Sequence, residues 1–200
     1  MYDPPTVALG YPMPPDTQVY NPLLDPKIDP EERQSAIAVW VSAFYDHPDF
    51  GSGEASGVHW GKPSEVVEPA DTPTIDCYSA EESAKFCTPF PVVRAADIPL
   101  LQPNMQALLE TQAHAALFDE NRVSSYFPRL KVVYMSGTQT MAVCIWAYTK
   151  TLQIHMAARA SGKAVRPVKF VLVPGANHLI HYHRSELVMR EILGGFTQVL

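Results

Sequence analysis

The sequence predicts an α/β protein with a long, proline-rich N-terminal part. Two short apolar runs, residues 130–135 and 168–173, flank an amphipathic segment, residues 141–160, which is the pattern of two parallel strands joined by a helical crossover. In addition, 16 of the 19 prolines lie at or before Pro103. Proline interrupts regular elements, so we expect short helices and turns in the first half and longer elements in the second.

The composition is typical of a folded domain that binds no nucleic acid. With 200 residues and 46% hydrophobic side chains, the chain can form a core, which excludes global disorder. A net charge of -6 and the lack of a Lys/Arg run argue against a nucleic-acid partner. The most apolar stretch, residues 141–158, contains Lys150 and other polar residues, so we expect a soluble protein without a membrane span.

The three cysteines indicate a reducing compartment. Cys77, Cys87 and Cys144 are widely spaced and form no C-x-x-C pair, and no secretory segment is evident. We therefore expect reduced thiols that mostly pack, in a cytoplasmic protein.

The first half predicts three helices after an irregular start. Between Thr6 and Asp29 the prolines favour extended and turn conformations, so no regular element is expected. Asp29-Pro30 then has the capping carboxylate and first-turn proline of a helix start. Its apolar stripe comprises Ile37, Trp40, Val41 and Phe44. The second helix begins with a capping box at Ser79 and runs to about Cys87. The third runs from Asn104 to Phe118.

The second half predicts strand, helix, strand and helix. Leu130 to Met135 is expected to form a buried strand closed by Ser136-Gly137, and Val168 to Val173 a second one. The helix between them runs from Met141 to Ala160, with Gly162 as its stop. Its expected buried face comprises Met141, Ile145, Tyr148, Leu152 and Met156. A last helix from Ser185 to Leu193 is expected to end at Gly194-Gly195.

The loop after the second strand holds the first candidate for chemistry. Loops at the carboxyl ends of parallel strands carry the functional sites of such sheets. His178 lies in this loop, which begins with Pro174-Gly175, and it can reach across the sheet edge as a general base. The alternative is a surface or capping histidine.

Several segments together resemble the α/β-hydrolase superfamily. Val168 to Val173, with the Pro-Gly-Ala-Asn-His loop and the helix after it, resembles the eighth strand, histidine loop and final helix. Leu130 to Gly137 and the helix that follows resemble the seventh strand and its helix, and Tyr2-Asp3-Pro4-Pro5 is similar to the end of the sixth strand. The resemblance implies a partial α/β-hydrolase fold. Residues 1–5 would end a core strand, residues 6–125 would form a helical lid, and residues 126–200 would form the C-terminal α/β portion.

The family pattern implies a Ser-His-acid triad with His178 as the base. Thr140 stands where many members carry the acid, so Asp3 is the preferred acid, with a turn-forming role as its alternative. No Gly-x-Ser-x-Gly elbow exists, and Ser136, weighed as a nucleophile, lacks such an elbow. The resemblance implies an ester-like substrate and a serine and oxyanion hole upstream of Met1. Alone, the chain is expected to be inactive.

The remaining expectations concern ligands and partners. A metal site formed by His178, His181 and His183 lacks supporting ligands, so we expect neither metal nor cofactor. The aromatic residues expected either to line a cleft for a small apolar or ester-like molecule or to be buried under the lid are Phe50, Trp60, Phe86 and Phe90. A two-stranded parallel sheet leaves an exposed edge, which predicts homo-oligomers or poor solubility. The alternative function is that of a truncated or degenerate paralogue that binds a ligand or partner.

Overall fold

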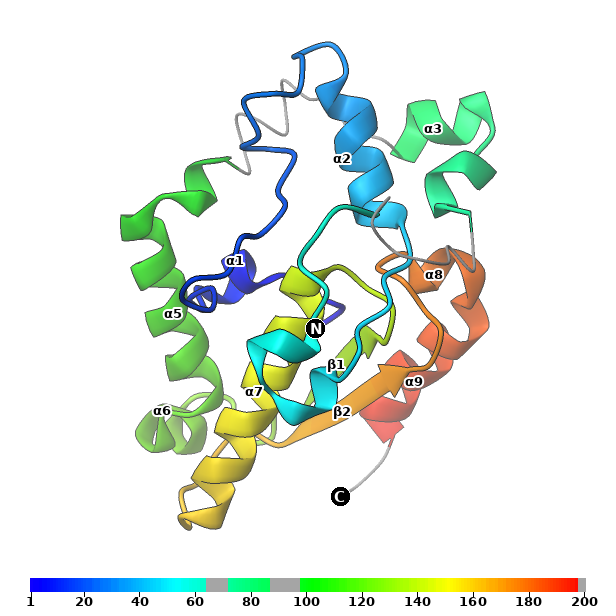
Figure 1. The fold of residues 1–200 in the computed structure, drawn as a ribbon. Coiled ribbons are helices and arrows are strands. Elements are labelled where there is room, and N and C mark those ends of the chain that lie inside the picture. Colours follow the sequence, from blue (N-terminus) through cyan, green and yellow to red (C-terminus); the bar gives the residue numbers. More distant parts are fainter. Residues whose placement is uncertain (64–71, 87–97, 198–200) are drawn as a thin grey trace.

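The centre of the fold is a parallel sheet with a helical crossover. The computed structural model describes residues 1–63, 72–86 and 98–197. Strands β1 (Val132–Gly137) and β2 (Val168–Val173) pair in parallel, with Val132 opposite Val168, and helix α7 (Ala142–Ala160) connects them (Figure 1). This arrangement confirms the mixed α/β class and the two parallel strands. β1 starts at Val132 rather than Leu130, and it continues through Gly137 instead of turning at Ser136.

The first residues of the chain lie along the other edge of β1. Tyr2 forms an isolated parallel bridge with Met135. The Asp3 amide donates to the Met135 carbonyl at 2.7 Å, and the Met135 amide donates to the Met1 carbonyl at 3.0 Å. These bonds bring Asp3 beside the carboxyl half of β1.

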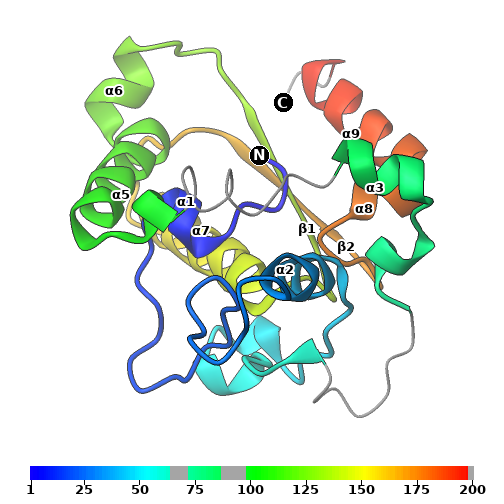
Figure 2. The same cartoon turned by 90° about the horizontal axis from the view of Figure 1, so that it is seen from above.

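Helices cover both faces of the sheet. Alternation along β1 directs Tyr134 toward α7 and the one-turn helix α1 (Thr6–Leu9), where it packs with Leu9 and Tyr148. The neighbouring residue Met135 points to the other face and packs with Val188 of α9 (Ser185–Thr197). Figure 2 shows α7 and α9 on opposite sides of the strands, so the core has two layers that share the sheet.

The expected lid segment is built of short helices around this core. It contains α2 (Arg33–Ser42), α3 (Ala80–Phe86), α5 (Pro103–Leu117) and α6 (Glu120–Ser125). The predicted capping box is confirmed, because the Glu82 amide donates to Ser79 Oγ at 3.2 Å and the Ser79 amide donates to Glu82 Oε2 at 2.8 Å. Whether this helix reaches Cys87 lies outside the described residues.

The helix predictions need correction at five places. Helix α1 lies inside the stretch for which no regular element was predicted, and α2 begins at Arg33 and ends before Phe44. The segments α6 and α8 (Ile180–His183) were not predicted. Helix α9 continues through Gly194-Gly195, because glycine weakens a helix by only about 1 kcal/mol and does not terminate it.

The buried face of α7 also differs from the prediction at its C-terminal end. Met156 is 58% exposed, whereas Cys144, Thr151 and His155 are buried. The His155 ring contacts the backbone carbonyl of Arg166 at 3.1 Å. Partners from the segment before β2 therefore decide which side of the helix is covered.

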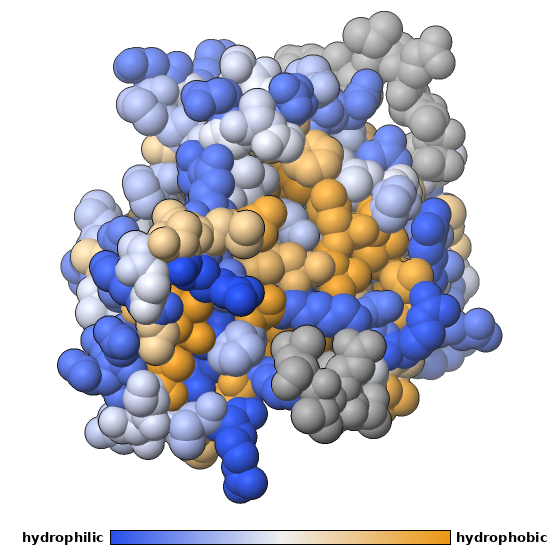
Figure 3. Space-filling model, turned by 90° about the horizontal axis from the view of Figure 1, so that it is seen from below, coloured by the Kyte–Doolittle hydropathy of each residue, from blue (hydrophilic) through white to orange (hydrophobic). Residues whose placement is uncertain are grey.

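Strand β2 forms the exposed edge of the sheet. Among the described residues its strand partner is β1 alone. Its apolar side chains from Val168 to Leu172 are only partly buried, and hydrophobic side chains gather in the middle of the face seen from below (Figure 3). No described helix combines the length and apolar character that a membrane span requires.

Candidate functional site

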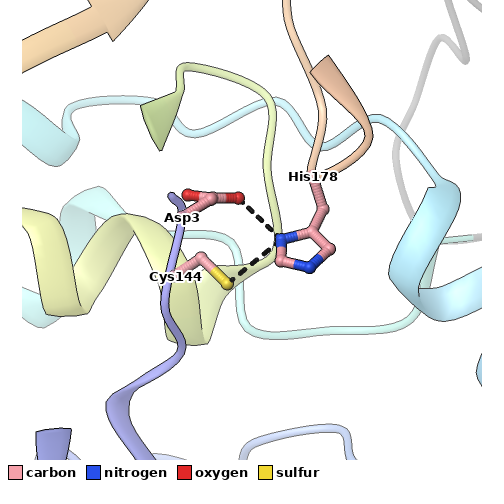
Figure 4. A group of neighbouring side chains, drawn as sticks. All are labelled: Asp3, Cys144 and His178. Carbon is pink, nitrogen blue, oxygen red and sulfur yellow. Dashed lines mark hydrogen bonds and ion pairs between the residues drawn. The ribbon is translucent and has the colours of Figure 1, made fainter. Parts of the chain in front are cut away.

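The structure brings Asp3 and His178 together at the carboxyl end of β1. His178 Nδ1 lies 2.8 Å from Asp3 Oδ2, although 175 positions separate the two residues in the chain (Figure 4). The Asp3 side chain is 0% exposed and the His178 side chain 21% exposed. An ionised carboxylate only accepts hydrogen bonds, so Nδ1 carries the proton and Nε2 keeps its lone pair. The ring is therefore oriented as a base.

Neutral donors surround the Asp3 carboxylate. The Ser136 hydroxyl donates to Oδ1 and the Thr140 hydroxyl donates to Oδ2, and the Cys144 sulfur lies within 4.8 Å of the carboxylate. Within the described part of the chain, no Lys or Arg forms an ion pair with Asp3. The partner that can become positively charged is His178, so the buried carboxylate stabilises an imidazolium at that position.

The backbone around Asp3 explains how its side chain reaches the site. Asp3 has a φ of 37°, in the left-handed region that Asp tolerates better than most residues. The Tyr2 hydroxyl donates to the His178 carbonyl at 2.7 Å and lies 2.9 Å from His181 Nδ1. The same short segment thus supplies the carboxylate and supports the histidine loop.

Two segments of the expected lid, residues 6–125, hold the other side of the histidine loop. The Asn177 side chain is 0% exposed, and its Nδ2 donates to the Ser42 carbonyl at 2.6 Å and to Thr74 Oγ1 at 2.8 Å. Its Oδ1 accepts from the Leu179 amide at 2.9 Å. Asn177 was not predicted to be a site residue, and its position directly before His178 was the available signal.

A third lid contact fixes the loop after β1. The His47 ring lies 2.8 Å, through Nε2, from the Thr140 carbonyl, and its Nδ1 accepts from the His59 amide at 3.1 Å. Nε2 therefore donates, and the ring is neutral. Burial lowers the pKa of His47 to about 4. His47 is only 8% exposed, and it ties the segment around residue 47 to Thr140.

The Cys144 thiol and the Ser136 hydroxyl lie next to Asp3 and His178, but neither is suited to act as a nucleophile. Cys144 Sγ lies 3.7 Å from His178 Nδ1, but the thiol is fully buried and burial raises its pKa. The Ser136 hydroxyl is also buried and donates to Asp3. No serine hydroxyl among the described residues hydrogen-bonds to His178, so within the described chain the histidine and the carboxylate have no serine positioned for activation by His178.

Three neighbouring side chains that could bind a metal ion are linked by hydrogen bonds rather than spaced as metal ligands. The ligand atoms of Asp3, Cys144 and His178 all lie within 4.8 Å of one another. Ligands of a tetrahedral zinc ion with bonds of about 2.0 Å stand about 3.3 Å apart, whereas 2.8 Å between Asp3 and His178 is a hydrogen-bond distance. His181 instead contacts Tyr2, and His183 Nε2 lies 2.7 Å from Thr74 Oγ1. The structure does not bring the three histidines together.

A cavity of about 920 Å³ opens beside His178. It lies among α1, α2, α5, the start of α7 and the chain around residues 19–24. Trp40 lines this cavity and also packs against the core cluster around Tyr45 and Met141, whereas Phe50 and Trp60 pack against Val58 and Trp146. Phe50 and Trp60 do not line this cavity, and both are partly buried. The Phe86 side chain and Phe90 lie outside what the structure describes.

Comparison with known proteins adds no family to this geometry. No protein-family model, curated protein or solved structure matches the chain.

Proposed function

We propose that this chain supplies the histidine and the acid of a serine-hydrolase-type site, as the C-terminal portion of an α/β-hydrolase acting on an ester-like substrate. The observation that carries the proposal is the orientation of His178. Its Nδ1 is held by a buried carboxylate, and the ring lines a large cavity, with the second nitrogen directed away from Asp3 (Figure 4). This is the arrangement a general base needs.

The proposed chemistry is acyl transfer. His178 Nε2 accepts the proton of a serine hydroxyl while the serine oxygen attacks the ester carbonyl carbon. The imidazolium then protonates the leaving alkoxide, and the same base activates water in the second half of the reaction. Asp3 stabilises the imidazolium. The serine and the oxyanion donors are provided by residues outside these 200, so the chain by itself is inactive.

A ligand-binding protein without catalysis is the second candidate. The cavity beside His178 and the lack of a serine next to the histidine among the described residues favour it. The alternative predicts ligand binding and no acyl-enzyme under any condition.

Fluorophosphonate labelling distinguishes the two. We expect no labelling of the 200-residue chain and labelling of the native gene product, including any residues encoded ahead of Met1, with loss of the label on His178→Ala. Labelling of the short chain at Ser136 would contradict the assignment of the base and its partner. An unlabelled native product would exclude the hydrolase and favour the binding protein.

Nitrogen NMR of the short chain tests the pair directly. The wild-type spectrum should show His178 protonated at Nδ1 at neutral pH. In Asp3→Asn the amide can donate to Nδ1, so the proton should move to Nε2 and the base at the cavity should be lost. Asp46→Asn, at an exposed carboxylate elsewhere, is the control and should leave the wild-type tautomer.

We also propose that the chain self-associates through β2. The outer edge of β2 has no described strand partner, and its one charged side chain, Lys169, is already paired with Glu191 at 2.7 Å. An edge without a free charge is a template for strand pairing. Light scattering after size exclusion should show dimers or larger species. A monodisperse monomer that unfolds cooperatively would contradict this prediction.

A further inference from the structure

We infer that the cavity beside His178 selects neutral, hydrocarbon-rich ligands and rejects anions. The inference rests on the proposed function only in placing the ester group at His178. Binding follows from the cavity walls themselves and needs no turnover.

The walls are mainly apolar, and the space is large enough for a whole ligand. Its volume of about 920 Å³ is typical of pockets that enclose a drug-sized molecule. Apolar residues from five parts of the chain contribute, among them Val7, Leu23, Trp40, Val41, Leu101 and Met141. Covering these side chains with hydrocarbon removes apolar surface from water, which favours binding.

Three of the polar side chains that line the cavity form hydrogen bonds within the protein. Gln106 Nε2 donates to the carbonyls of Val7 at 3.1 Å and Leu100 at 2.5 Å. The Thr6 hydroxyl donates to Met13 Sδ at 3.3 Å, and Asn21 Oδ1 accepts from the Leu23 amide at 3.0 Å. These groups stabilise the walls, so they offer little recognition to a charged head group.

Among the described residues that line the cavity, the fixed charge is negative. No Lys or Arg is among its described lining residues, whereas Glu110 lines it and the Asp3 carboxylate lies directly behind His178. A carboxylate ligand would lose water, find no cation and face two negative charges. A neutral ester would meet the apolar walls without this penalty.

Displacement of the neutral dye Nile red from the 200-residue chain at pH 8 measures the selectivity. Ethyl octanoate should displace the dye at a concentration about tenfold lower than octanoate does. In Glu110→Lys, the affinity for octanoate should rise about fivefold while the affinity for the ester stays unchanged. The change is modest because Glu110 is exposed. Glu120→Lys, an exposed acid on α6 that does not line the cavity, should alter neither. Equal displacement by the two ligands, or no gain for octanoate in Glu110→Lys, would overturn the inference.

A second pair of variants tests the location. Ala107 is exposed on α5 and lines the cavity, so Ala107→Trp should fill the space and weaken ester binding at least about tenfold. Leu108→Trp, at the next position and outside the lining, should bind as wild type does. Unchanged binding in Ala107→Trp would refute the cavity as the site. Ester binding without labelling of the native gene product would refute the hydrolase and leave this inference standing.

Discussion

Replacing Gly137 with alanine should displace the histidine loop and separate His178 from Asp3. Gly137 ends β1, and a Cβ at this position would lie 2.1 Å from the Ala176 carbonyl oxygen and 2.7 Å from its carbon. Both atoms belong to the backbone of the histidine loop, and the Ala176 oxygen also accepts from the Gln139 amide at 2.9 Å. A rotamer change cannot relieve such a clash. We expect a loss in the free energy of unfolding of more than about 3 kcal/mol, the upper end for overpacking.

Urea unfolding and the NMR signal of His178 measure this effect. The matched control is Gly194→Ala in α9, where an added Cβ meets nothing within 4 Å. That variant should raise the free energy of unfolding by about 0.5–1 kcal/mol, because alanine favours the helix. If Gly137→Ala kept the wild-type urea midpoint and the Nδ1 tautomer of His178, the close approach of the two loops would be wrong.

Acidification should destabilise the protein through His47. Burial holds the pKa of this histidine at about 4, below its ordinary value of 6.5. Between pH 6.5 and 4 the unfolded chain binds a proton that the folded ring does not, so stability is complete above pH 6.5 and falls as the pH decreases toward 4. A shift of this size corresponds to about 3 kcal/mol. Protonation would also place a donor at Nδ1, against the His59 amide.

Urea unfolding at a series of pH values isolates the contribution of His47. Between pH 6.5 and 4, His47→Gln should reduce the slope of the free energy of unfolding against pH by the amount that corresponds to the uptake of about one proton. His114→Gln, at an exposed histidine of α5, should leave the slope of the wild-type curve unchanged. A His47→Gln curve parallel to that of the wild type would show that this histidine titrates normally and does not tie Thr140 to the lid.

Signals within a few residues account for the elements that the sequence predicted well. The capping box at Ser79 satisfies backbone donors of its own helix, and the apolar run at Val168 marks its own strand, although all of that strand except Val173 is only partly buried rather than buried as predicted. The predicted segment Asn104–Phe118 is helix α5, Pro103–Leu117. Signals of this kind failed at Gly194, through which α9 continues, and at Met156, where partners outside the helix decide which side of α7 is buried.

By itself, the sequence determined the α/β class and the order of strand, helix and strand, because both follow from hydrophobic periodicity and local capping. Its pattern also pointed to His178 and Asp3, whose catalytic roles remain predictions. Only the tertiary structure decided that these side chains meet at 2.8 Å, that Thr140 and Ser136 serve the carboxylate, and that His47 supports Thr140. Those contacts join residues more than 90 positions apart. No local pattern encodes them, because packing of the whole chain determines which polar groups share a buried space.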